Sequence, residues 1–128
     1  MFCKSKIIIF DKKNKFAGNK NITSINKHIN LDTVNDYIEN SKVLLDIHKK
    51  GQDGLSFRVF ESLGANKKLI TTNSDIKNYD FYNSNNIFVI ENDKTIIEKS
   101  FFETEYIPIA ESILRKYQLE NWVDQLIQ

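Results

Sequence analysis

A loop bounded by two glycines, and the segment that follows it, hold the residue types best suited to a charged ligand. The stretch KKGQDGLSFRVFESLG, residues 49–64, places Arg58 and Glu61 three positions apart. Arginine is rare in this chain, where Arg115 is its only other occurrence, and it offers a planar fork of donors that lysine cannot reproduce. Arg58 could therefore bind a phosphate, and Glu61 could accept hydrogen bonds from both hydroxyls of a sugar diol.

Helical periodicity predicts how this segment presents the pair. Residues 55–65 have apolar side chains at helical spacing, and Arg58 and Glu61 fall together on a different face. The apolar stripe consists of Leu55, Val59 and Leu63, with Phe60 beside it. The helix is expected to end in the Gly64-Ala65-Asn66 region. The pair should therefore stay accessible while the helix packs on its other side.

The loop before this helix is expected at the carboxyl end of a buried strand, residues 42–48. In open α/β sheets, ligands bind at that edge. Gly51 and Gly54 let the backbone approach a ligand closely, and the first free N–H groups of the helix, around residues 55–57, favour an anion. Two lysines at the start of the loop add positive charge. A phosphate is the ligand that this combination favours.

The same residues have a plainer interpretation. An Arg–Glu pair at this spacing is commonly a surface ion pair worth roughly 0.2–0.5 kcal/mol, and glycines after a strand are ordinary turn residues. The loop matches neither GxGxxG nor GxxxxGK[ST]. His28 and His48 are isolated histidines, expected to be structural or exposed. The sequence contains no Cys/His cluster, HExxH motif or nucleophile elbow, so a metal site or hydrolase triad has no support.

The whole chain predicts alternating strands and helices. Residues 11–30 and the polar stretch 73–85 are expected to be loops. Pro108 should lie in the first turn of a C-terminal segment whose two helices meet near Gln118. The expected strands are 4–10, 42–48, 67–72 and 86–91, and the expected helices lie within 30–41 (with Asp32 as N-cap), 55–65, 92–103 and 109–127.

Strand, helix and strand joined by short loops form a βαβ unit, in which the two strands are parallel. The order of elements therefore predicts an open, mostly parallel α/β sheet with helices on both faces. A length of 128 residues fits one domain, residues 1–128.

Composition limits the classes of partner. A net charge of +1 gives no electrostatic argument for nucleic acid or for an anionic membrane surface. Cys3 is the single cysteine, so an internal disulfide is impossible. No apolar run approaches the roughly 18–20 residues of a membrane span, and the four apolar residues 7–10 are too few for a signal-peptide core. We expect a soluble, cytoplasmic protein.

A longer stretch carries a resemblance to a known family. The run SKVLLDIHKKGQDGLSFRVFESLGANKKLITTNSDIKNYDFYNSNNIFVIEND, residues 41–93, resembles the C-terminal domain of bacterial glycosyltransferases of the GT-B type, which have two Rossmann-like domains. It is most similar to those of polysaccharide or lipopolysaccharide biosynthesis. The stretch YQLENWVDQLI, residues 117–127, resembles their final helix, and the similarity extends over residues 31–128. The resemblance implies a Rossmann-like sheet that forms one half of a GT-B fold.

The resemblance also implies roles for individual residues. In many enzymes of this fold, an acidic residue, seven others and a glutamate mark the donor-sugar nucleotide site, and Asp53 and Glu61 have this spacing. Glu61 would hold the ribose, and Asp53 or Gln52 would lie near the donor sugar. Asp53 departs from the commoner glutamate. The implied donor-nucleotide site consists of Gln52, Asp53, Gly54, Leu55, Ser56, Arg58 and Glu61, with backbone N–H groups of residues 54–56 on the diphosphate and Arg58 close by.

The implied activity is transfer of a hexose-like sugar from a nucleotide-diphosphate donor, with no metal or other cofactor. A complete enzyme of this architecture carries the acceptor site and usually the catalytic base in its N-terminal domain, so no catalytic residue is assigned. The implied partners are a nucleotide sugar and either an N-terminal GT-B domain on another chain or a second copy. Peripheral association with the inner face of the membrane fits such a role, whereas nucleic acid does not.

Two other interpretations remain open. The chain could be a non-catalytic interaction or regulatory module derived from such a domain. A receiver-like or generic nucleotide-binding α/β domain is less favoured. A receiver domain needs an acidic cluster at the end of the first strand and a phosphorylatable aspartate. Asp11 and Asp46 are the candidates, but Asp46 is expected inside its strand rather than at its end.

Overall fold

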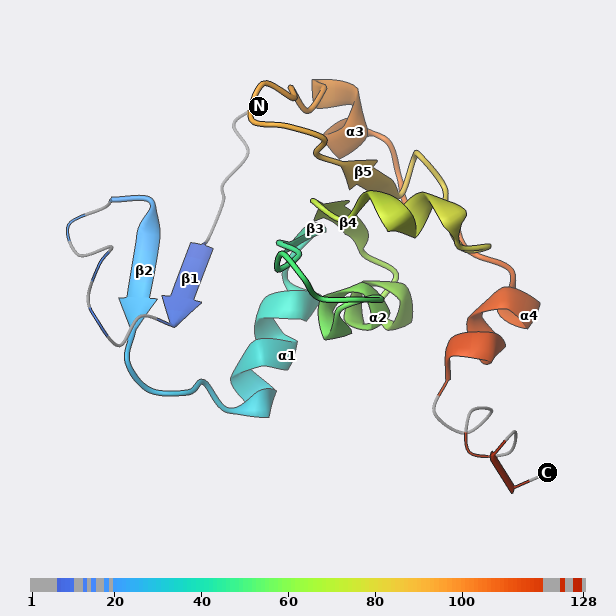
Figure 1. The fold of residues 1–128 in the computed structure, drawn as a ribbon, viewed down its shortest axis with the longest axis horizontal. Helices are drawn as coiled ribbons and strands as arrows, with labels where there is room; N and C mark the ends of the chain where they lie inside the picture. Colours follow the sequence, from blue (N-terminus) through green and yellow to red (C-terminus); the bar gives the residue numbers. More distant parts are fainter. Residues whose placement is uncertain are drawn as a thin grey trace. The chain divides into compact units, whose positions relative to one another are not determined.

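The structure is a computed structural model that describes residues 7–10, 13, 15, 18, 20–118, 123 and 126–127. The expected strand start at residues 4–6, Cys3, Asp11 and most of the expected final helix lie outside the described residues. The chain divides into two compact units, residues 1–35 and 36–128. The protein is a mixed α/β protein with short parallel strands in two small open sheets (Figure 1).

The first unit contains a two-stranded parallel sheet. Strand β1, Ile7–Phe10, pairs with β2, Ile22–Ile25, in a register that places Ile7 beside Ile22. The prediction of a loop throughout residues 11–30 is therefore wrong for β2. The sequence of β2, ITSI, is rich in β-branched residues, which favour extended backbone. Its short length and polar, lysine- and asparagine-rich flanks concealed that preference.

Helix α1, Leu31–Glu39, is capped by a different residue than expected. The side-chain oxygen Oδ1 of Asn30 accepts a hydrogen bond from the N–H of Thr33 at 2.8 Å, so Asn30 caps the helix. Asp32 lies inside the first turn, where its negative charge interacts favourably with the helix dipole. Ile38 is the buried residue of this helix.

The second unit contains a three-stranded parallel sheet in the order β3-β4-β5. The strands are β3, Val43–Asp46, β4, Lys68–Thr71, and β5, Ile87–Val89, each shorter than predicted. The expected burial of β3 on both faces is wrong, because β3 is an edge strand of this sheet and Leu45 is 44% exposed.

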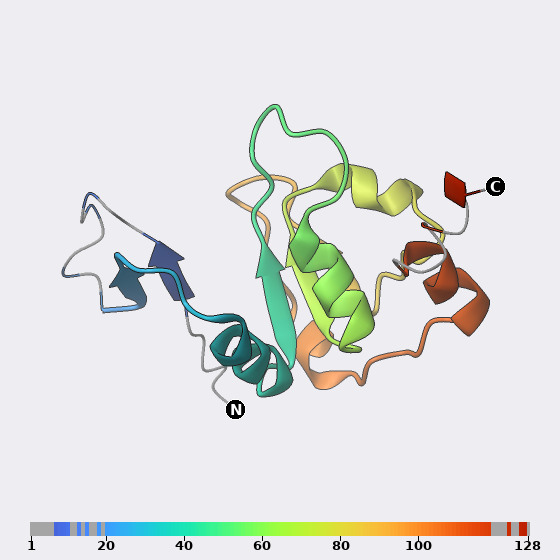
Figure 2. The same ribbon diagram turned by 90° about the horizontal axis from the view of Figure 1, so that it is seen from below.

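Helices lie on both faces of this sheet. Helix α2, Phe57–Gly64, packs along β3 and β4, as Figure 2 shows, with Val59 and Leu63 buried. On the other face, α3, Lys99–Glu103, places Phe101 edge-on against Phe88 of β5, with ring centroids 5.7 Å apart. Since neighbouring residues of a strand point to opposite faces, β4 turns Leu69 and Thr71 toward α2, and Lys68 and Ile70 toward α3.

Helix α2 differs from the prediction at its start but not at its end. The helix begins at Phe57, two residues later than expected, because Ser56 has extended backbone with φ −78° and ψ 162°. The helix ends in the predicted region, where Asn66 adopts a left-handed conformation with φ 53°. Asparagine tolerates that conformation better than most residues, which explains how the chain turns into β4.

The C-terminal part of the described chain starts its helix later than predicted. Helix α4, Glu111–Leu114, follows Ala110 and continues into a 3₁₀ turn, η2, Arg115–Tyr117. Pro108 is not in its first turn. The Asn86 side chain binds both the N–H and the carbonyl of Ile107, at 2.9 and 2.7 Å, and a residue before proline avoids helical backbone. A further 3₁₀ turn, η1, Ser74–Asn78, lies within the stretch expected to be a loop.

Candidate functional site

The loop 47–56 occupies the carboxyl edge of the three-stranded sheet. Figure 2 shows it rising beyond the tip of β3 and returning to the start of α2. Gly51 and Gly54 have φ values of +85° and +79°, which side-chain-bearing residues rarely adopt. Both glycines have open space where a Cβ atom would stand. The two glycines are therefore needed for the shape of the loop rather than to avoid a collision within the protein.

The residues of the predicted nucleotide site fall in this loop and the first two turns of α2. Gln52, Asp53 and Gly54 are exposed, whereas Leu55 and Ser56 are half-buried. Asp53 makes no hydrogen bond or ion pair within the described part of the chain. The loop therefore presents its middle to solvent and anchors its end against the protein.

Arg58 and Glu61 form the ion pair that their spacing predicts. Nη1 of Arg58 lies 2.9 Å from Oε2 of Glu61, and the two side chains are 38% and 27% exposed. Among the described residues, Glu61 Oε1 has no hydrogen-bond partner. This geometry fits the plainer interpretation of a surface ion pair, and it also leaves donors of Arg58 and one carboxylate oxygen available to a ligand.

A buried carboxyl group lies directly beneath the loop. Asp46, the last residue of β3, is 5% exposed. The Ser56 hydroxyl donates to its Oδ1 at 2.6 Å, and the Thr71 hydroxyl donates to its Oδ2 at 2.7 Å. A buried carboxyl group is costly unless its oxygens are hydrogen-bonded, so this pair of hydroxyls explains how Asp46 is accommodated.

The hydrogen bonds continue from Thr71 into the loop. Thr71 Oγ1 accepts from the N–H of Asn73 at 3.0 Å, and Asn73 Nδ2 donates to the carbonyl of Gly54 at 3.3 Å. At the other end of the loop, the N–H of His48 donates to Thr72 Oγ1 at 2.8 Å. The loop is thus tied to the strand ends at His48, Gly54 and Ser56. We call Asp46, Ser56, Thr71 and Asn73 the anchoring network.

The anchoring network affects the start of α2. Ser56 is the N-cap residue, a position where serine usually bonds the helix N–H groups, yet its side chain makes no such bond because its hydroxyl is directed to Asp46. The N–H of Val59 bonds the carbonyl of Ser56 at 3.2 Å. In the described part of the chain, the N–H groups of Phe57 and Arg58 have no partner. Such groups at a helix start favour an anion.

Sequence reasoning missed Asp46, Thr71 and Asn73. It placed Asp46 inside its strand, whereas β3 ends at this residue. The chain leaves the sheet here because the N–H of His48 bonds a side chain, that of Thr72, instead of a neighbouring strand. A polar residue interrupting the apolar run VLLDI was the available signal. The strand-end position does not make Asp46 a receiver-type phosphorylation site, since it is buried and both its oxygens accept hydroxyl protons.

His48 has a second feature of note. Its Nδ1 atom is buried and has no hydrogen-bond partner among the described residues. The ring as a whole is partly exposed. His48 is thus neither fully buried nor fully exposed, and its expected structural role stays a prediction.

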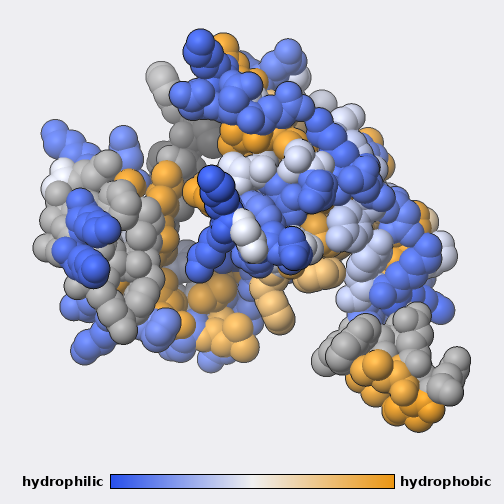
Figure 3. Space-filling model, in the orientation of Figure 1, coloured by the Kyte–Doolittle hydropathy of each residue, from blue (hydrophilic) through white to orange (hydrophobic). Residues whose placement is uncertain are grey.

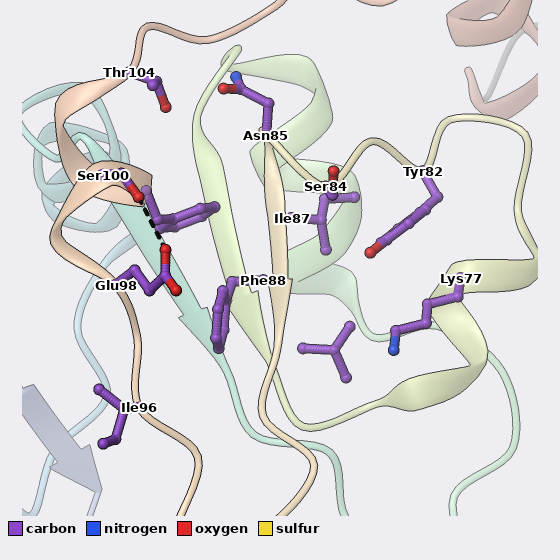
Figure 4. Close-up of a pocket in the computed structure, with 12 residues that line it drawn as sticks. Lys77, Tyr82, Ser84, Asn85, Ile87, Phe88, Ile96, Glu98, Ser100 and Thr104 are labelled. Carbon is purple, nitrogen blue, oxygen red and sulfur yellow. Dashed lines mark hydrogen bonds between the residues drawn. The ribbon is translucent and has the colours of Figure 1, made fainter.

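A separate groove of about 530 Å³ follows the outer edge of β5. Figure 4 shows Lys77 and Tyr82 on one side of it and Glu98 and Ser100 on the other. Lys77 Nζ lies 3.0 Å from Glu91, and this hydrogen bond raises the pKa of Lys77. The positive charge in the groove is therefore already paired, and the lining does not indicate a ligand class.

The described residues lack two kinds of feature. No group of three or more His, Cys, Asp or Glu side chains in the part that the structure describes could hold a metal ion. In the same part of the chain, no helix has the length and apolar character needed to cross a membrane. Comparison with family models, with curated proteins and with solved structures finds no match to this chain.

Proposed function

We propose that this protein binds the donor nucleotide sugar of a GT-B-type glycosyltransferase that makes cell-surface polysaccharide or lipopolysaccharide. One observation carries the proposal. Helix α2 starts at the carboxyl edge of a parallel sheet, and its capping hydroxyl on Ser56 is directed to Asp46 instead of the helix N–H groups. This arrangement supports a diphosphate at the helix start, since N–H donors there and the helix dipole both favour an anion.

The remaining roles follow the family resemblance. Backbone N–H groups of residues 54–56, together with those at the start of α2, contact the diphosphate. Arg58 adds a charged donor, and Glu61 accepts hydrogen bonds from the ribose. Asp53 and Gln52 lie near the donor sugar. Two observations support these roles: the loop is exposed, and Oε1 of Glu61 has no hydrogen-bond partner among the residues that the structure describes. No metal is invoked in this scheme, in which Arg58 and the N–H groups supply hydrogen-bond donors to the diphosphate.

The proposal also covers the fold family of the protein and a partner domain. We assign the sheets to a Rossmann-like half of a GT-B fold, whose acceptor domain lies on another chain or, in a homo-oligomer, on a second copy. Hydrophobic residues reach the surface between hydrophilic ones (Figure 3). Two large hydrophobic side chains at the ends of the loop are exposed: Ile47, its first residue, by 70%, and Phe57, the residue after it, by 83%. Large exposed apolar side chains beside a ligand-binding loop are typical of a surface that another protein covers, which supports the proposed partner domain.

The test is a titration of the purified protein with UDP, GDP, CDP and ADP, followed through backbone amide NMR shifts. We expect one nucleotide to shift amides of residues 51–61. Arg58→Ala and Glu61→Ala should each weaken that binding about tenfold or more, because a charged hydrogen bond is worth about 1.5–3 kcal/mol. Both variants should keep their melting temperature within a few degrees, since exposed ion pairs contribute little to stability.

Arg115→Ala is the matched control, because Arg115 forms an i, i+4 ion pair with Glu111 at 2.7 Å, outside the proposed site. Its binding should equal that of the unmodified protein. A folded protein that binds none of the four nucleotides would contradict the proposal and favour a non-catalytic interaction module. Equal losses of nucleotide affinity in Arg58→Ala and Arg115→Ala would mean that the net charge of the protein, and not a contact by Arg58, determines binding.

A further inference from the structure

We propose that Thr71 is a positioning residue that sets the shape of the loop 47–56 for nucleotide diphosphate binding, acting through Asp46 and Asn73. This inference rests on the proposed function for its ligand, but the anchoring network that carries it is independent of any ligand. The network joins two strand ends to the loop through four hydrogen bonds of 2.6–3.3 Å.

Thr71 lies too deep to act as a ligand contact. Its exposed fraction is 0%, and Asp46 and Asn73 are each 5% exposed. All three side chains lie below a loop whose residues 51–54 are exposed. Any influence of Thr71 on a ligand must therefore pass through the backbone of the loop.

The Thr71 hydroxyl makes two hydrogen bonds of opposite kind. It donates to Oδ2 of Asp46 at 2.7 Å and accepts from the N–H of Asn73 at 3.0 Å. A single rotatable hydroxyl can do both, whereas a methyl group can do neither. Replacing it with an isosteric methyl leaves one buried acceptor and one buried donor unpaired, which is more costly than the loss of an exposed hydrogen bond.

The two arms of the network end on either side of Leu55. Asn73, held by Thr71, donates to the carbonyl of Gly54 at 3.3 Å, and Asp46 accepts from Ser56 at 2.6 Å. Residues 54–56 are the segment whose N–H groups are proposed to contact the diphosphate. Asp46 also keeps the Ser56 hydroxyl away from the N–H groups at the start of α2. Loss of the Thr71 hydroxyl should thus disturb both ends of that short segment.

Two substitutions in the full-length chain separate positioning from packing. Thr71→Val keeps the volume and loses the hydroxyl, whereas Thr71→Ser keeps the hydroxyl and loses a buried methyl group. We expect Thr71→Val to weaken binding of the best of UDP, GDP, CDP and ADP about tenfold. Thr71→Ser should bind within about threefold of the unmodified protein, even though its melting temperature falls. Affinities are compared at a temperature where circular dichroism shows all proteins folded.

Amide hydrogen exchange without nucleotide provides the second readout. Thr71→Val should raise exchange rates in residues 48–56 and leave those of β5 unchanged, while Thr71→Ser should not raise them. Arg58→Ala should separate the two readouts, with weakened binding and unchanged exchange. Equal binding losses in the valine and serine variants, or unchanged loop exchange in Thr71→Val, would overturn the positioning role. If the unmodified protein binds no nucleotide, the proposed function fails, and exchange in the two Thr71 variants still decides whether the hydroxyl orders the loop.

Discussion

Strand β4 buries polar side chains on both of its faces, and the two faces use them differently. Toward α3, Lys68 is 4% exposed, and its Nζ donates to the carbonyl of Phe101 and to Thr104 Oγ1, both at 2.7 Å. Toward α2, Thr71 donates to Asp46 and accepts from Asn73. Lys68 lies at the amino end of the strand and Thr71 at its carboxyl end.

The difference lies in what each side chain holds. Lys68 reaches the last turn of a helix, where free carbonyl groups and the helix dipole favour a positive charge, and its Nζ lies 4.9 Å from the centroid of the Phe101 ring. Desolvation by burial lowers the pKa of Lys68. Thr71 instead holds a loop that has little packing of its own. One strand thus fixes a helix through a charge and the loop 47–56 through a hydroxyl.

The largest effect should come from the α3 face. Lys68→Ala removes two hydrogen bonds and the buried aliphatic stem, so the free energy of unfolding should fall by about 3 kcal/mol. Urea denaturation followed by circular dichroism measures this change. Amide shifts of residues 51–56 should stay close to those of the unmodified protein, because the loop is held from the other face.

Lys67→Ala is the matched control for this substitution. Lys67 is the preceding residue, and its Nζ makes an exposed hydrogen bond to the carbonyl of Glu39 at 2.9 Å. Its loss should cost less than about 1 kcal/mol. Large amide shifts in the loop 47–56 of the Lys68→Ala variant would contradict this prediction, because they would show that the two faces of β4 are coupled.

A smaller effect should come from the loop backbone. Gly54→Ala forces a side chain onto a residue with φ +79°, at a cost of about 1–2 kcal/mol, although nothing blocks the added methyl group. Gly64→Ala is the matched comparison, because Gly64 ends α2 without a positive φ and also has open space. It should raise stability by about 0.5 kcal/mol. Thermal unfolding of both variants tests this, and equal shifts would show that loop shape does not depend on Gly54.

The smallest effect should come from an exposed polar contact, in contrast to the buried contacts of Lys68 and Thr71. Asp80 accepts hydrogen bonds from Lys116 and from the Tyr117 hydroxyl. Lys116 first, and then Tyr117, lower the pKa of Asp80 from its ordinary value of 3.8. A lowered pKa means that the stabilisation is present above pH 3.8 and is lost as the pH falls through the value in the folded protein.

Asp80→Asn should therefore be less stable than the unmodified protein at pH 7, and the two free energies of unfolding should converge at low pH. Urea unfolding across this range is the measurement, repeated in high salt, which should shrink the difference at pH 7. Burial and then the hydrogen bond to Asp80 raise the pKa of Tyr117 to about 12. A difference that grows as the pH falls would contradict the assignment.

The sequence predicted the central βαβ unit well because several signals agree there. The apolar run of β3, the stripe of α2 and the turn at Asn66 all point to the same structure. The predicted site residues do lie along one loop and the helix after it, and their roles remain predictions. The anchoring network could not be predicted, because Asp46 and Thr71 meet only through strand register. The late start of α4 was equally hidden, since it depends on contacts between Asn86 and Ile107, which are far apart in the chain.

Every pairing in the β3-β4-β5 sheet joins strands that follow one another along the chain. Pairings between neighbouring segments keep contact order low, so each strand can pair with the one that was synthesised just before it. The order in which the ribosome releases these strands is therefore the order in which the sheet can grow. Asp46, Ser56, Thr71 and Asn73 all precede β5 in the chain, so none of the hydrogen bonds that anchor the loop needs a residue of the last strand.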